Sequence, residues 1–210
     1  MRPLFCMTRS QARTSSSHSQ FNRLGPRADI GRCYGIGVDS LPNTRDFAYY
    51  LTGAPLPPGR NAEWADNIRQ CVASGKYMGR IHIIDQLLNP YLQFEIDWYY
   101  TVNGAAGEDI RFIFREDVPD VPYTDTWLFD DETVLDLSYT KEGVLLYVNN
   151  NDHPERLEQA RTAWHAFFER SFPLADLLAM IRNGEIQIPD RTQQSRKPQQ
   201  RLYDRNRVRA

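Results

Sequence analysis

The chain contains two short apolar segments, MGRIHIID and DIRFIF, with an amphipathic stretch between them. The first is rich in β-branched residues and almost continuously apolar, which predicts an interior strand over 79–85 that is covered on both faces. The second alternates in polarity, which predicts a strand over 109–114. Asn89-Pro90 is a typical helix start, so we expect residues 89–101 to be helical. The order strand, helix, strand predicts a βαβ unit with parallel strands.

The remaining periodic segments surround this unit. Apolar residues recur at helical spacing from Trp64 to Val72, and Gly75 follows as a stop signal. Asp152 and Glu155 have the spacing of a capping box. Further strands are predicted over 126–130, 133–138 and 144–148, and further helices over 46–51, 62–74, 153–170 and 174–182. The predicted fold class is therefore α/β (α+β): a single domain in which a mixed sheet of about five strands has helices packed on it.

Charge divides the chain into three parts. Six arginines against Asp29 give residues 1–32 a net charge of +5, and seven basic residues against Asp204 give residues 191–210 a net charge of +6. The net charge of −2 therefore conceals a centre of −13. We expect a loosely ordered basic extension over 1–39, a globular domain over 40–183 and a disordered basic tail over 184–210. The acidic centre repels nucleic acid, which leaves only weak binding through the tails.

The sequence favours a cytoplasmic protein. It has no run of about 18 apolar residues that could span a membrane, and its first 20 residues lack the apolar stretch of a secretory signal. The three cysteines, Cys6, Cys33 and Cys71, show no C-x-x-C spacing, which is typical of a protein kept reduced.

Two glycine-containing segments invite comparison with phosphate-binding loops. NGAAGED, residues 103–109, follows a predicted helix and precedes a strand, which is the reverse of a P-loop, and it lacks the Gly-Lys-Ser/Thr ending. We therefore expect Gly104 to end the helix and Gly107 to form the turn. YGIGVDS has Gly35 and Gly37 but neither a third glycine nor a following helix, so it predicts no phosphate site either.

The histidines and carboxylates predict neither a metal site, a cofactor nor a catalytic constellation. Glu95 stands out because helical spacing places it on the apolar face with Tyr91, where a carboxylate needs a partner such as Arg80 or Arg111. That pair is either a structural ion pair or the polar end of a small-molecule pocket. The candidate pocket residues are Arg80, His82, Tyr91, Glu95 and Arg111.

Several of these segments together resemble a known family. GKYMGRIHIID, YLQFEIDWYY, AAGEDIR and WLFDD occur in order and with compatible spacing, and from about Phe47 to about Leu178 the chain resembles the actinobacterial domain of unknown function family 6879. The resemblance implies an accessory or sensor module that is commonly encoded beside helix-turn-helix regulators, and it assigns no catalytic residues. The pattern is also distantly similar to phospholipase-D-like domains, but Ile84 stands two residues after His82 where their His-x-Lys motif has lysine.

Three functional hypotheses follow. The first is a non-catalytic regulatory or ligand-sensing module that works with a DNA-binding helix-turn-helix regulator and binds a small molecule. The second is an enzyme that acts on a small phosphorylated or nucleotide-like substrate through Arg80, His82, Glu95 and Arg111. The third is nucleic-acid binding through the basic tails, with an affinity that falls steeply as salt rises.

Overall fold

The computed structural model describes residues 32–37, 44–139 and 145–188 of the chain. The expectations for the basic extension before residue 32 and for the tail after residue 188 lie outside these residues. The described strands form one seven-stranded mixed sheet in the order β6-β5-β4-β1-β2-β3-β7. The strands are β1 (Arg32–Gly37), β2 (Tyr77–Ile84), β3 (Asp109–Phe114), β4 (Thr126–Phe129), β5 (Thr133–Tyr139), β6 (Leu145–Asn150) and β7 (Phe172–Pro173).

The first three strands are parallel and the others add antiparallel to them. β2 lies between β1 and β3, in parallel register with both. β4 pairs antiparallel with β1, β5 and β6 continue outward from β4, and β7 pairs with β3 at the opposite edge. The predicted βαβ unit is thereby confirmed as the parallel centre of the sheet.

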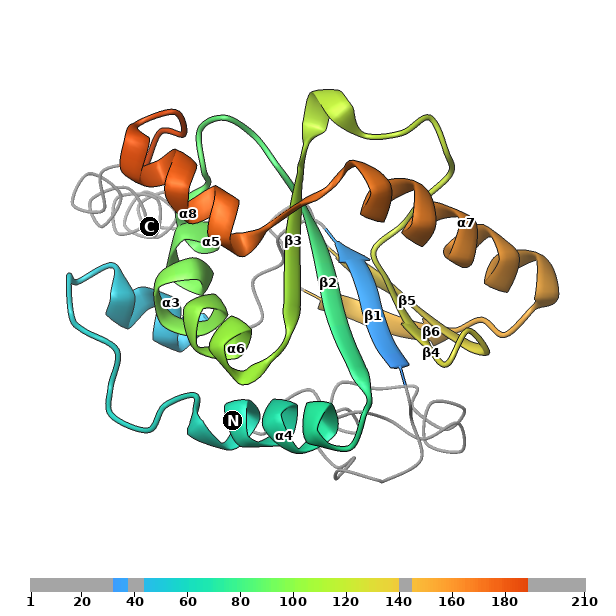
Figure 1. Ribbon diagram of the computed structural model, residues 1–210, viewed down its shortest axis with the longest axis horizontal. Helices are drawn as coiled ribbons and strands as arrows, with labels where there is room; N and C mark the ends of the chain where they lie inside the picture. The colour runs from blue at the N-terminus through green and yellow to red at the C-terminus, as the bar shows by residue number, and fades with distance from the viewer. Residues whose placement is uncertain (1–31, 38–43, 140–144, 189–210) are drawn as a thin grey trace, which may run out of the picture.

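Helices cover both faces of the sheet (Figure 1). On one face lie α3 (Thr44–Tyr50), α8 (Leu174–Asn183) and the continuous helical segment formed by α5 (Pro90–Glu95), the π-helix η1 (Ile96–Tyr100) and α6 (Thr101–Ala106). The long helix α7 (Pro154–Arg170) lies on the other face, and α4 (Ala62–Ala73) runs beneath the sheet in this view. A short 3-10 helix, η2 (Arg115–Asp117), follows β3.

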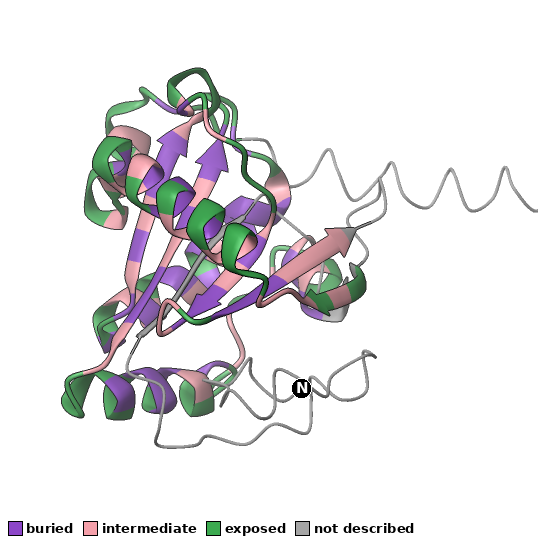
Figure 2. Cartoon of the chain, turned by 90° about the vertical axis from the view of Figure 1, so that its right-hand side faces the viewer, coloured by how far each residue is buried: buried purple, intermediate pink, exposed green. Residues whose placement is uncertain are grey.

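Alternation along the strands sends side chains into two apolar layers. Ile81, Ile83 and Ile113 pack with Trp164 and Phe167 of α7. Ile84, Ile110 and Phe112 pack on the opposite face with residues of α5, η1 and α8. Figure 2 shows the result: β2, β3 and β4 are largely buried or intermediate, whereas the edge strand β6 and the outer sides of the helices are more exposed. Burial of the strands on both faces accounts for the nearly continuous apolar character of β2.

The fold class and the elements predicted from periodicity are confirmed, and the sheet is larger than expected. β1 comes from residues that the sequence analysis assigned to the loose extension, yet it pairs on both sides in the middle of the sheet. Its sequence, RCYGIG, holds two glycines, which weaken any strand prediction. β7 contains only two residues and is too short to show a period.

Two helix ends differ from their predictions. Gly104 lies inside α6, where a Cβ atom would come within 3.2 Å of the Leu174 side chain, so its missing side chain lets α8 approach. The helix ends instead at Gly107, whose φ of +107° favours glycine. The N-cap of α7 is His153, one residue after the predicted Asp152, and the His153 side chain makes no capping bond.

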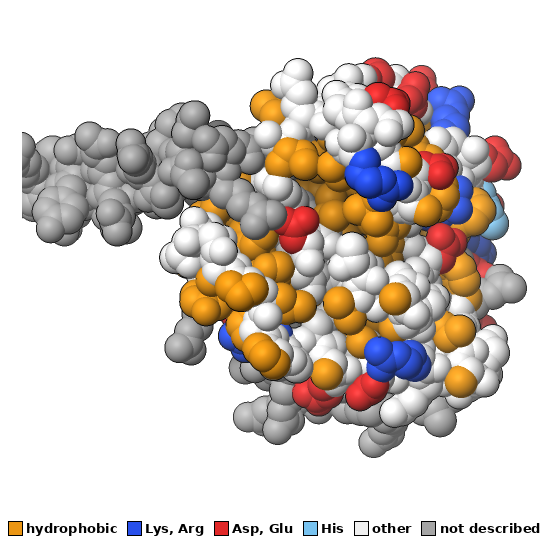
Figure 3. Space-filling model, turned by 60° about the vertical axis from the view of Figure 1, so that its left-hand side comes forward, with side chains coloured by type: hydrophobic (Ala, Val, Ile, Leu, Met, Phe, Trp, Pro, Cys, Tyr) orange, Lys and Arg blue, Asp and Glu red, His pale blue; other side chains and the backbone are white. Residues whose placement is uncertain are grey.

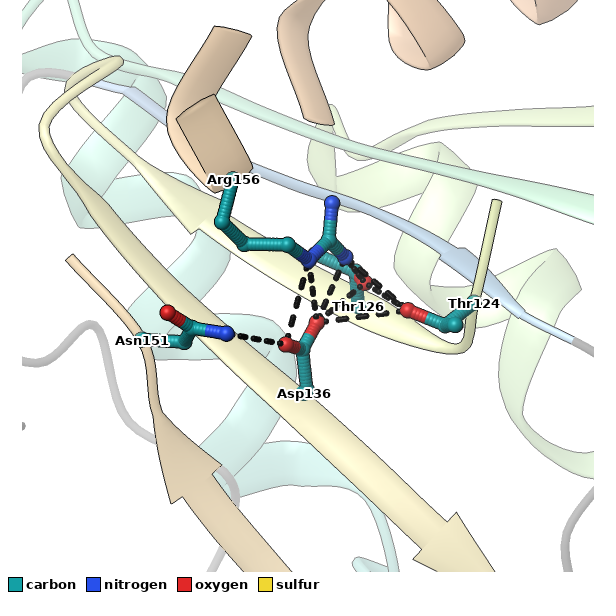
Figure 4. A network of polar contacts seen from close by, with 5 residues as sticks. All are labelled: Thr124, Thr126, Asp136, Asn151 and Arg156. Atoms are coloured by element: carbon teal, nitrogen blue, oxygen red, sulfur yellow. Dashed lines mark hydrogen bonds and ion pairs between the residues drawn. The ribbon is translucent and has the colours of Figure 1, made fainter. Parts of the chain in front are cut away.

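A polar network joins the start of α7 to the strands beneath it (Figure 4). Arg156 donates from Nε to both carboxylate oxygens of Asp136 at 3.1 Å, and from Nη2 to the hydroxyls of Thr124 and Thr126 at 2.9 and 2.6 Å. Asn151 donates to the same carboxylate at 3.4 Å. Asp136 and Arg156 are largely removed from water, which costs free energy for each charge. The attraction between the two charges offsets that cost.

We expect Asp136→Asn to lower the free energy of unfolding at pH 7 by about 2 kcal/mol, because it weakens charge-assisted hydrogen bonds that are partly buried. A matched control is Asp66→Asn, which removes the exposed Asp66–Arg69 pair within α4 and should cost less than about 1 kcal/mol. Urea unfolding of both variants measures the difference, and equal losses would contradict this assignment.

The stabilisation should also depend on pH. Burial alone would raise the pKa of Asp136, but the hydrogen bonds and the charge of Arg156 outweigh burial, so the pKa is lowered. A carboxyl group of this kind stabilises the fold above its unfolded pKa of about 3.9 and loses that contribution as pH falls further. The gap between wild type and Asp136→Asn should therefore be full at neutral pH and shrink below about pH 4.

Candidate functional site

One turn of the helical segment between β2 and β3 is a π-helix. Asn89 caps the start of the segment by accepting a hydrogen bond from the N–H of Leu92 at 2.8 Å. Further along, the N–H of Thr101 bonds to the carbonyl of Ile96, five residues earlier. A π-turn holds one more residue than an α-turn and is frequent at functional sites. The side chains that η1 presents to the sheet are therefore of particular interest.

The π-turn brings Glu95 and Tyr100 together. They are five residues apart, which is the hydrogen-bond spacing of a π-helix, and their side chains meet on one side of the segment. The Tyr100 hydroxyl donates to Oε2 of Glu95 at 2.5 Å and lies 2.7 Å from Nε2 of His82 on β2. The Tyr100 hydroxyl therefore links the two side chains, with Glu95 on one side and the imidazole of His82 on the other.

Arg80 extends this polar cluster along β2. It donates to Oε1 of the buried Glu108 at 2.6 Å. Its guanidinium carbon lies 5.2 Å from the ring centre of Tyr100 and 5.7 Å from that of Trp127 on β4, within the range of cation–π attraction. Burial is the largest single influence and disfavours the charged form of Arg80, but Glu108, Tyr100 and Glu95 together outweigh it, so the pKa of Arg80 is raised. The cluster therefore contains a permanent positive charge.

The register of β1 shows why Arg80 can lie across the sheet. Gly35 is the partner of Arg80 on one side and of Trp127 on the other, and Gly37 is the partner of His82. Directly paired residues share a sheet face, so β1 contributes no side chain between Arg80 and Trp127 or beside His82. Glycine inside a strand often marks a place where a ligand or another group approaches closely. Gly35 and Gly37 thus contribute to the site through their lack of side chains.

The structure brings together three of the five predicted pocket residues. Arg80, His82 and Glu95 lie in one cluster with Tyr100, which sequence reasoning did not select. Glu95 accepts the bond from Tyr100 and its charge favours the charged form of Arg80, whose guanidinium also pairs with Glu108. No sequence signal locates the π-turn, so the alignment of Tyr100 with Glu95 could not be foreseen.

The other two predicted residues lie elsewhere. Arg111 is on the α7 face of the sheet, where its guanidinium lies 4.3 Å from the ring centre of Phe168 and donates to the Ser171 hydroxyl at 2.8 Å. Tyr91 is buried in an aromatic cluster with Phe94 and Phe47 at ring distances of 5.5 and 5.3 Å. Strand alternation explains Arg111, because an odd-numbered residue of β3 faces away from Phe112.

Among the described residues, no group of His, Cys, Asp and Glu side chains is arranged to hold a metal ion. Within the same ranges, no helix is long and apolar enough to cross a membrane. A small cavity of about 90 Å³ lies near the carboxyl ends of β2 and β3, where Asp85 and Arg115 form an ion pair at 2.7 Å. Arg115 holds the pKa of Asp85 below its usual value through a hydrogen bond and its charge.

The fold and the site define a mixed α/β protein with a polar cluster on the sheet face that η1 covers. A family model described as a domain of unknown function (DUF6879) matches residues 40–179. The chain therefore belongs to this family, as AAGEDIR and WLFDD indicated. Neither a curated protein nor a solved structure matches the chain.

A double-mutant cycle tests the composition of the cluster. Tyr100→Phe and Glu95→Gln should show a coupling energy of about 1 kcal/mol in urea unfolding, because each removes part of the same hydrogen bond. Tyr100→Phe and Arg111→Gln should be additive within about 0.5 kcal/mol, because Arg111 lies across the sheet. Additivity in the first pair, or strong coupling in the second, would contradict the site as described.

Proposed function

We propose that this protein is a non-catalytic ligand-sensing module that acts with a helix-turn-helix transcription regulator. The observation that carries the proposal is the π-turn that places Tyr100 between His82 and Glu95 on a largely apolar sheet face. Buried polar groups cost stability unless they are fully bonded, so their concentration here favours a role beyond packing. The family resemblance supports the regulator as the partner.

The chemistry of the cluster fits recognition of a small polar molecule. Glu95 is a hydrogen-bond acceptor, Arg80 is a cationic donor flanked by aromatic rings, and His82 has a second ring nitrogen besides the one that faces Tyr100. Tyr100 is only 1% exposed, and its hydroxyl is bonded on both sides. This arrangement suits a residue that positions its neighbours better than one that attacks a substrate. A small polar molecule that carries both donors and acceptors is the class that these groups favour.

The surface offers a place for a protein partner. Figure 3 shows hydrophobic side chains gathered over the face on which α3, α5 and α8 lie. Tyr49 on α3, Leu87 after β2 and Ile188 after α8 are exposed apolar residues of the described chain. Leu87 is bridged to Gln187, so Leu87 and Ile188 lie close together. Contiguous exposed apolar surface is typical of an interaction site.

The regulator association should depend on this surface. Native co-purification with the adjacently encoded helix-turn-helix protein should recover a complex with the wild-type chain, and Leu87→Lys should weaken it at least about fivefold by burying a charge. Leu146→Lys on β6 is the matched control, because Leu87 and Leu146 are 55% and 54% exposed. A complete lack of association between the wild-type chain and the regulator would contradict the proposal.

A second candidate is an enzyme that acts on a small phosphorylated or nucleotide-like substrate. The chain of bonds from His82 through Tyr100 to Glu95 resembles a proton relay, which is the observation in its favour. Arg111 cannot contribute, since it lies on the other face. Hydrolysis of p-nitrophenyl phosphate or of nucleoside triphosphates by the wild type, abolished in His82→Ala and retained in Arg111→Gln, would favour this candidate. Nucleic-acid binding through the tails concerns residues outside the described chain.

A further inference from the structure

The π-helix η1 contacts the candidate site with one residue and helix α3 with the three residues before it. Asp97 accepts a hydrogen bond from the Tyr50 hydroxyl at 2.6 Å. Trp98 packs edge-on against Tyr50 and Tyr49, with ring centres 5.5 and 6.0 Å apart. Tyr99 donates to Asp46 at 2.9 Å. The next residue, which holds the site, is Tyr100.

The aromatic contacts described for α3 are made with the helical segment. The aromatic cluster that anchors α3 contains Tyr50, Tyr91, Phe94 and Trp98, with Phe47, Leu51, Leu56 and Tyr99 packed against it. All of them belong to α3, to α5, to η1 or to the loop that follows α3. Asp46 of α3 also forms an ion pair at 2.8 Å with Arg60, which likewise lies outside the sheet. A change in η1 therefore reaches α3 directly.

A π-turn can change its state without unfolding. It differs from an α-turn by a one-residue shift in hydrogen-bond register, and residues on either side of such a shift rotate relative to one another. Bistable elements of this kind are what convert small shifts at a binding site into larger displacements. Because four consecutive residues of η1 divide between the site and α3, the same shift would be felt at both.

We infer that η1 couples the Tyr100 site to α3, so that the state of the site sets the position of α3 and its exposed residue Tyr49. This inference rests on the proposed sensing function and identifies α3 as the surface through which the regulator detects ligand. The ligand shifts the equilibrium only by its differential affinity for the two states of η1. The coupling is reciprocal, so a partner bound at α3 changes the affinity of the site by the same factor.

The experiment is amide hydrogen exchange on the full chain, with a mutation at the site in place of a ligand. Tyr100→Phe removes the hydroxyl that bonds His82 and Glu95, and peptides that cover α3 should then exchange at least about fivefold faster than in wild type. Tyr77→Phe is the matched control, because Tyr77 donates to Asp109 at 2.8 Å on the opposite sheet face. It should leave α3 unchanged, and α7 serves as the internal reference for global stability.

A second variant tests whether the coupling runs through the contacts between η1 and α3. In an Asp97→Asn, Tyr99→Phe background the contacts of η1 to α3 are already weakened, so adding Tyr100→Phe should change α3 exchange less than about twofold. Unchanged α3 exchange in Tyr100→Phe, or an equal rise in α3 and α7, would overturn the inference. No regulator is present in this measurement. Loss of the complex with coupling intact would therefore reject the proposed function, and loss of coupling with the complex intact would reject only this inference.

Discussion

The parallel pairing of β2 with β3 is the constraint on which the rest of the structure depends. Parallel neighbours require a crossover, and here that crossover is the helical segment from Pro90 to Ala106, which must pack on one sheet face. This arrangement places η1 directly over Arg80 and His82. The same pairing leaves the other face to α7, and the strands between the two layers become apolar on both sides.

Two largely buried ion pairs lie on opposite faces of the sheet, and the two differ in role. Asp136 and Arg156 fasten α7 to β5, with threonine and asparagine completing the network. Arg80 and Glu108 join β2 to the turn before β3, and the guanidinium lies between two aromatic rings beside Tyr100. The first pair stabilises contact between a helix and the sheet. The second holds a cation next to groups whose bonding η1 controls.

Periodicity predicted most of the fold, because an element buried on one face has apolar residues at regular spacing. It missed β1 for a physical reason: Gly35 and Gly37 supply pairing geometry without supplying hydrophobic side chains. For the site, Glu95 was identified from its place on an apolar helix face, and Arg80 and His82 as polar residues near it. Arg111 was misplaced because strand alternation was not applied to it. Tyr100 was missed because α-helical spacing separates it from Glu95, and only the π-turn aligns them.

Because of the π-turn, the contacts of the helical segment depend on the number of residues that it contains. Between the cap at Asn89 and the end at Gly107, the segment holds one residue more than an uninterrupted α-helix would need for the same contacts. If the segment kept every residue but adopted ordinary α-helical bonding throughout, the part before η1 would rotate by roughly 100° relative to the part after it. Phe94 would then leave the α3 cluster and Glu95 would leave Tyr100. The count of residues in this segment therefore carries information that residue identity alone does not.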